Sequence, residues 1–181
     1  TAMELPGPQI TSILAACAAH QRADNQILII QALGRRGAEA VPALADFADP
    51  TPVAATAGRR GNRARAESNP QSALAVRIAA IHALAETDQQ PALTILVGLL
   101  DDGEETIRRA ALDGIAAMSC KEADATVLAM LKSTNTSDRL MGLELAGSRR
   151  MTGSLGAVVS AASDADAGVR RAALKRWGEL A

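Results

Sequence analysis

The chain has 181 residues, of which 48% are hydrophobic but only 1% aromatic, and its formal net charge at pH 7 is −1. So small a net charge excludes a general electrostatic attraction to nucleic acid or to an acidic membrane surface. The apolar runs are shorter than the roughly 18 residues that predict a transmembrane helix, and no signal peptide opens the chain, which slightly favours a cytoplasmic location. Because the sequence begins at Thr1 rather than at Met, we expect it to be a piece of a longer protein.

The first predicted helix lies within residues 4–20. Pro8 suits a first helical turn, where its missing N–H costs nothing. One apolar face follows at helical spacing, formed by Ile10, Ile13, Leu14 and Cys17. We interpret the segment as the second helix of an incomplete leading repeat, over about residues 1–22, which would cap the array.

A full repeat is predicted over residues 23–49. Its first helix occupies about residues 24–35, and Gly34 is expected to stop it, because glycine enters the left-handed conformation without a Cβ penalty. The second helix continues through Val41, Leu44 and Phe47.

The next stretch, about residues 50–70, collects Gly, Pro and Arg and is predicted to be an inserted loop with at most one short helix. Ser68 or Asn69 before Pro70 marks the start of the next helix. Four cations lie close together in the insertion: Arg59, Arg60, Arg63 and Arg65. They could bind phosphates or an acidic protein patch. We favour a solvated, mobile insertion, since no aromatic residue accompanies them for base stacking.

From Pro70 onward the sequence repeats with a period of 31 residues, marked by a column of Arg77, Arg108, Arg139 and Arg170. Matched apolar residues flank three of these arginines, whereas Asp138 takes the valine position before Arg139. A residue that returns at a fixed period with its neighbours predicts an array of helical repeats. Gln26 stands in the arginine position of the repeat at 23–49.

Each period is predicted to hold two helices. First helices are expected near 71–86, 104–118, 136–148 and 166–180. Second helices are expected near 90–100, 122–132 and 152–162. The repeats then cover 71–102, 103–133, 134–164 and, in part, 165–181. The faces around Ala80 and Ala111 are rich in small residues, which let helix axes approach closely. No segment shows sustained period-two alternation, so no sheet is expected. We predict a single all-α domain over 1–181, a right-handed α-solenoid of about four and a half helical hairpins.

The Val-Arg-x-Ala-Ala-x-x-x-Leu profile at 76–84 and 107–115, with a drifted copy at 169–177, resembles the HEAT-repeat superfamily. It is most similar to the short HEAT-like repeats of the phycobilisome-lyase type. The resemblance implies an armadillo-type helical fold and says little about function, because such arrays serve many unrelated roles.

The arginine column could line a binding surface, but we favour a structural ladder in which each guanidinium bonds carboxylates or carbonyls of an adjacent turn. His82 shares an exposed, variable position with Asp113, Glu144 and Lys175, and His20 is isolated, so neither suggests a metal site. Di-iron HEAT-like hydroxylases carry His-Glu pairs in their repeats, and this chain has none.

Two further side-chain types are assigned from the repeat positions. Cys17 and Cys120 are expected to be buried thiols. Trp177 falls in the core column of Leu84, Ile115 and Ala146, yet no second helix follows it to cover that column. We therefore expect apolar surface at the C-terminal end, covered by more repeats or by self-association.

These observations favour a non-catalytic protein-interaction or scaffold module without a cofactor, whose groove, lined by second helices, holds a protein partner or a neighbouring domain. The first alternative is nucleic-acid binding through the loop at 59–65, as in HEAT-like DNA glycosylases. The second is a chromophore-lyase-like enzyme, which only the family name suggests.

Overall fold

The computed structural model describes residues 7–49 and 70–180. The predicted insertion and the helix start at Ser68 or Asn69 lie outside them, as do the candidate contacts Arg59, Arg60, Arg63 and Arg65. Within the described residues the protein is all-α, with ten α-helices, three short 3-10 turns and no strand. The predicted fold class is confirmed.

The helices lie close to their predicted limits. They are α1 (Gly7–Ala18), α2 (Ala23–Gly34), α3 (Val41–Ala48), α5 (Pro70–Glu86), α6 (Gln90–Gly98), α7 (Glu105–Ala117), α8 (Lys121–Leu131), α9 (Thr136–Ser148), α10 (Leu155–Ala161) and α11 (Ala167–Leu180). The 3-10 turns are η1 (Gly37–Ala40) before α3, η3 (Leu99–Asp101) after α6 and η4 (Thr152–Ser154) before α10. Each predicted second helix between 90 and 162 therefore exists, two of them with a 3-10 turn at one end.

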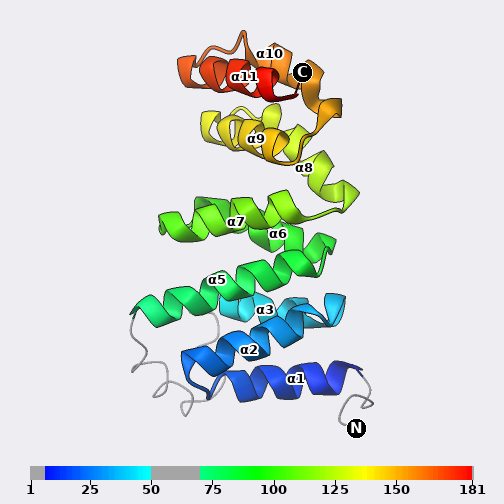
Figure 1. Ribbon diagram of the computed structural model, residues 1–181, viewed down its shortest axis with the longest axis vertical. Coiled ribbons are helices and arrows are strands. Elements are labelled where there is room, and N and C mark those ends of the chain that lie inside the picture. The colour runs from blue at the N-terminus through cyan, green and yellow to red at the C-terminus, as the bar shows by residue number, and fades with distance from the viewer. Residues whose placement is uncertain (1–6, 50–69, 181) are drawn as a thin grey trace. The chain divides into compact units, whose positions relative to one another are not determined.

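The chain divides into two compact units, one up to Gly114 and one from Ile115. In the first unit, α2 packs on α5 in one layer and α3 contacts α6 in the other (Figure 1). In the second unit, α9 packs on α11, and α8 contacts α10. First helices thus stack on first helices and second helices on second helices, as expected of a helical-repeat array. A single domain over 1–181 remains a prediction.

Small residues are buried at the centre of α5 and α7, as the sequence predicts, together with larger apolar ones. Ala80 and Leu84 of α5 and Ile107 and Ala111 of α7 are fully buried. In α9, a Cβ atom added at Gly142 would lie 2.9 Å from the backbone nitrogen of Leu131. The helices therefore approach closely enough that one methyl group no longer fits.

Gly34 ends α2, but the predicted reason is wrong. Among the glycines of the described residues, the one with a positive φ is Gly37, at 69°. Gly34 instead permits close contact between α2 and α5, because a Cβ atom there would lie 3.0 Å from the Cβ of Ala83. A side chain at this position would push the two helices apart.

The predicted apolar face of α1 is only half right, because Ile10 and Leu14 are half-buried but the other two members are not. Ile13 and Cys17 are exposed, whereas Thr11 and Ala18 are buried. The buried side carries the hydroxyl of Thr11, which accepts a hydrogen bond from Nε of Arg36 at 3.0 Å. A polar residue thus faces the core because it has a partner there.

Two further predictions of burial differ from the structure. Cys17 is exposed and Cys120 is only half-buried, so neither cysteine is the buried thiol that was expected. Trp177 is 44% exposed, whereas Leu84 and Ala146 at its repeat position are fully buried. The exposure of Trp177 agrees with the expectation of apolar surface at this end and departs from its assignment to the core.

Candidate functional site

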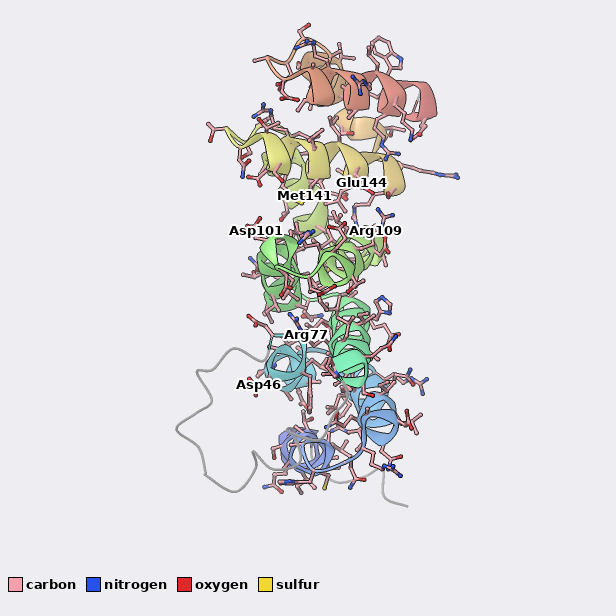
Figure 2. The ribbon with its side chains drawn as sticks, turned by 90° about the vertical axis from the view of Figure 1, so that its left-hand side faces the viewer. Asp46, Arg77, Asp101, Arg109, Met141 and Glu144 are labelled. Atoms are coloured by element: carbon pink, nitrogen blue, oxygen red, sulfur yellow. The ribbon has the colours of Figure 1, made fainter. Side chains whose placement is uncertain are left out.

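The arginine column points into the connections between helices. Nε of Arg77, which is labelled in Figure 2, donates to the carbonyl of Ala48 at 2.9 Å, and another nitrogen of the same guanidinium donates to Asp102 at 2.6 Å. In the preceding repeat, Nε2 of Gln26 donates to the carbonyl of Ala18 at 3.0 Å. Ala18 and Ala48 are the last residues of α1 and α3, where helix carbonyls lack partners within the helix. Both side chains therefore cap the second helix that precedes them.

The later members of the column donate to carbonyls of the connectors between helices. Arg108, Arg139 and Arg170 donate to the carbonyls of Asp102, Ser133 and Asp164 at 2.6, 3.0 and 2.7 Å. Arg108 also pairs with Glu105. Each reaches the connector six residues before it, so the column fastens the turn that leads into each first helix.

Asp102 and Asp164 each join two successive arginines. The Asp164 carboxylate accepts from Nε and a terminal nitrogen of Arg139 at 2.8 and 3.0 Å, while its carbonyl accepts from Arg170. Asp102 joins Arg77 and Arg108 in the same way. Ser133 stands at the equivalent position of the repeat between them. These contacts are of the kind that a structural ladder requires.

The pKa of both aspartates lies below its ordinary value. For Asp102, burial raises the pKa, but hydrogen bonds from the Glu104 N–H and from Arg77, with the charges of Arg77 and Arg108, outweigh it. For Asp164, the hydrogen bond from Arg139 lowers the pKa most, followed by one from the Asp166 N–H. Both groups are held as carboxylates by the arginines that they join.

A second inward arginine was not predicted. The side chain of Arg149 is only 7% exposed, and two of its nitrogens donate to Asp124 at 3.0 and 2.6 Å. A third donates to the carbonyl of Ile115 at 2.7 Å, at the end of α7. The sequence holds a sign of this arginine, because two repeats carry arginine at the same position: Arg36 stands ten residues after Gln26, as Arg149 does after Arg139. Arg36 makes the corresponding contact with Thr11.

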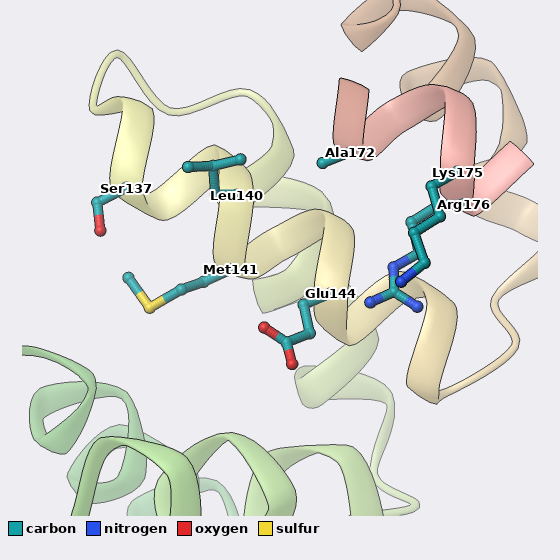
Figure 3. A pocket seen from close by; sticks show the side chains of 7 residues that line it. All are labelled: Ser137, Leu140, Met141, Glu144, Ala172, Lys175 and Arg176. Carbon is teal, nitrogen blue, oxygen red and sulfur yellow. The ribbon is translucent and has the colours of Figure 1, made fainter. Parts of the chain in front are cut away.

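A groove of about 320 Å³ lies between α9 and α11 in the second unit (Figure 3). Leu140 and Met141 of α9 and Ala172 of α11 give it an apolar lining. Its charged residues are Glu144, Lys175 and Arg176. Met141 and Glu144 leave α9 on the same side, since they stand three residues apart in a helix. The groove is therefore open and apolar, with charges of both signs along it.

The first unit has a groove of about 380 Å³ between α2 and α5. It is lined by Ile27, Gln31, Ala75, Ile78, Ala79, His82, Ala83 and Glu86. The two grooves use the same repeat positions, since Ile78, Ala79 and His82 correspond to Leu140, Met141 and Glu144 after two periods. Both lie between first helices, whereas the predicted groove was lined by second helices. The variable position that the sequence marked as merely exposed contributes a polar side chain to each groove.

The described residues contain no group of three or more His, Cys, Asp or Glu side chains that could hold a metal ion. In the same part of the chain, no helix is both long enough and apolar enough for a bilayer crossing.

No protein-family model matches the chain, and no curated protein does either. Among solved structures, the chain is similar to one from the complex of CpcE and CpcF of phycocyanin lyase from Nostoc sp. PCC7120. The two are 17% identical, the match covers 99% of this chain and 68% of that one, and the TM-score is 0.49. We base no argument about function on this similarity, because fold alone does not determine function.

Proposed function

We propose that the chain is a non-catalytic protein-interaction module whose grooves between first helices receive segments of a partner. The observation that supports the proposal most is that both grooves use the same repeat positions with different side chains. In repeat proteins, such positions can change the binding partner without changing the fold, because each repeat packs only on its neighbours.

The groove between α9 and α11 suits a helix or an extended segment better than a small molecule. Small-molecule sites enclose most of their ligand, whereas a groove between two helices lies open along its length. Leu140 and Met141 offer apolar contact, and Glu144 and Lys175 border it with opposite charges. Amphipathic helices are recognised in this way, with apolar anchors in the groove and charges beside it.

Affinity capture with matched variants tests the proposal. Leu140 and Val159 are 37% and 43% exposed and both belong to the second unit, but only Leu140 lines the groove. Proteins captured from extracts of the source cell by the wild type and by Val159→Glu should be lost with Leu140→Glu. Capture that is unchanged by Leu140→Glu would show that this groove is not the site.

The same capture, repeated after nuclease treatment, addresses the nucleic-acid alternative. That alternative rests on Arg59, Arg60, Arg63 and Arg65, which lie outside the described residues. Partners that survive the nuclease bind the protein directly, as we expect. Partners lost with the nuclease would favour the alternative.

A further inference from the structure

Within each unit, one arginine of the column also reaches forward to the connector that ends its repeat. Arg77 of α5 pairs with Asp102 at 2.6 Å, and Arg139 of α9 pairs with Asp164 at 2.8 Å. Each aspartate stands 25 residues after its arginine. The four side chains are at most 20% exposed, so water and salt screen these ion pairs less than they screen surface pairs. Each pair therefore ties a first helix to the connector that leads into the following first helix.

The corresponding step from α7 to α9 has a serine in place of the aspartate. Ser133 stands 25 residues after Arg108. Arg108 pairs with Glu105 of its own helix and donates to the carbonyl of Asp102. A neutral hydroxyl is a poor substitute for a carboxylate, because hydrogen bonds between ionised groups are about twice as strong as neutral ones. The sequence therefore interrupts the pattern of ion pairs at this one step.

A second departure occurs in the same connector. The residue before the column arginine is apolar in the other regular repeats, and Val76, Ile107 and Val169 are at most 8% exposed. Its counterpart before α9 is Asp138, which is half-buried and accepts a hydrogen bond from Oγ of Ser133 at 2.7 Å. The connector into α9 thus lacks both the carboxylate and the buried apolar side chain, and its two replacement residues bond to each other.

The two departures fall where the chain divides. Arg108 belongs to the unit that ends at Gly114, and Ser133 belongs to the unit that begins at Ile115. We propose that this step is a flexible joint at which the two units move relative to each other, and that Ser133 and Asp138 make it flexible. Protein segments move most easily where few buried contacts and ion pairs oppose the motion.

Each unit carries one of the two grooves. The joint therefore lets one partner engage both grooves over a range of separations, a consequence that rests on the proposed function.

Distances between spin labels on cysteines of the full chain test the joint directly. One label is placed at Cys17 of α1 and one at Ser160→Cys of α10, so that each unit carries one, and Cys120→Ser removes the remaining cysteine. The matched pairs within a unit are Cys17 with Asp46→Cys, and Ser160→Cys with Lys132→Cys after Cys17→Ser, all at exposed positions. Double electron–electron resonance should give a broad distance distribution between the units and narrow distributions within each.

A restored connector tests the role of the two residues. Ser133→Asp with Asp138→Val installs the pattern of an aspartate followed five residues later by an apolar residue, as at 102–107 and 164–169. This change should narrow the distribution between the units toward the width found within them, because Arg108 gains a carboxylate. The matched variant Ser133→Asn with Asp138→Val has nearly the same shape without the charge and should narrow it less. Arg108→Gln, added to the restored connector, should broaden it again.

Three results would overturn the proposal. The first is a distribution between the units that is as narrow as those within them while Ser133 and Asp138 are in place. The second is a restored connector that leaves a broad distribution unchanged in a protein that circular dichroism shows to be folded. The third is equal narrowing by the asparagine and aspartate variants. No partner takes part in the measurement, so failure here leaves the groove proposal standing.

Discussion

Two positions on the regular first helices, five residues apart, differ in what they hold and where they point. The first is always arginine, and its side chain donates to a backbone carbonyl earlier in the chain, at the end of α3 for Arg77 and in the preceding connector for the other three. The second holds His82, Asp113, Glu144 or Lys175, of which Glu144 is half-buried and the other three are exposed. The repeat therefore keeps the residue that satisfies backbone carbonyls and varies the one that faces outward. A planar guanidinium with several donors is difficult to replace in the first role, whereas the second role imposes no single geometry.

The largest expected loss of stability comes from replacing Arg149, which also bonds backbone carbonyls but stands outside the arginine column. Arg149→Ala should destabilise the protein by about 2–4 kcal/mol, because it removes a buried side chain that satisfies Asp124 and a helix-end carbonyl. The neighbouring exposed residue provides the control, and Arg150→Ala should change stability by less than about 0.5 kcal/mol. Urea unfolding followed by circular dichroism measures both. Similar losses for the two variants would mean that Arg149 contributes no more than a surface residue.

The next largest loss of stability is expected where α9 packs closely on α8, at Gly142. Gly142→Ala should cost about 1–3 kcal/mol, since the new Cβ would lie 2.9 Å from the Leu131 nitrogen. Gly156→Ala in α10 should instead be neutral or slightly stabilising, because no atom lies within 4 Å and alanine favours the helix. Thermal melts of both variants provide the measurement. If Gly142→Ala melted at or above the wild-type temperature, the helices would be less tightly packed than described.

The arginine position and the variable position can be compared within one helix, α5. Arg77→Gln should destabilise by about 1–2 kcal/mol, because glutamine cannot reach both the Ala48 carbonyl and Asp102 with a charged fork. His82→Gln, on the outward side of α5, should stay within about 0.5 kcal/mol of the wild type. Chemical denaturation of the pair gives the answer. Equal effects would remove the distinction between the two positions.

The smallest expected effect is on the pH dependence of stability in acid. Since the pKa of Asp102 and Asp164 is lowered in the folded protein, their ionisation stabilises the fold above the unfolded pKa of about 4. That stabilisation is lost as the pH falls through the lower folded pKa. Asp102→Asn and Asp164→Asn should therefore be less stable at pH 7 but show a shallower loss of stability below about pH 4. Urea midpoints measured from pH 7 to pH 2.5 test this, and curves parallel to the wild type would contradict it.

The sequence predicted the helices and buried faces that recur with the 31-residue period. A residue that returns every 31 positions with the same neighbours reports a fixed environment, so the helices from Pro70 and the buried faces around Ala80 and Ala111 could be placed. The contacts of Gln26 also follow the column, although the residue type differs.

What the sequence did not predict lies where a single copy departs from the period. In α1, the direction of the buried face depends on Arg36, a residue 25 positions later that bonds Thr11. The position of Arg149 is arginine in one earlier repeat, at Arg36, but the partner there is Thr11 rather than an aspartate, so the pair with Asp124 did not recur as a pattern. The role of Gly34 depends on its distance to Ala83, which periodicity does not encode. The grooves went unrecognised because their variable position looks, in sequence, like an ordinary exposed one.

The most direct test of the account compares two adjacent residues of α9. Arg139 reaches the connector and Asp164, while Leu140 lines the groove. Unfolding midpoints and the capture of groove-dependent partners are measured together for Arg139→Gln and Leu140→Glu. We predict that Arg139→Gln lowers the midpoint and, below that midpoint, retains the partners, whereas Leu140→Glu keeps the midpoint and loses them. A stable Arg139→Gln protein that loses its partners, beside an unstable Leu140→Glu protein that keeps them, would contradict the account.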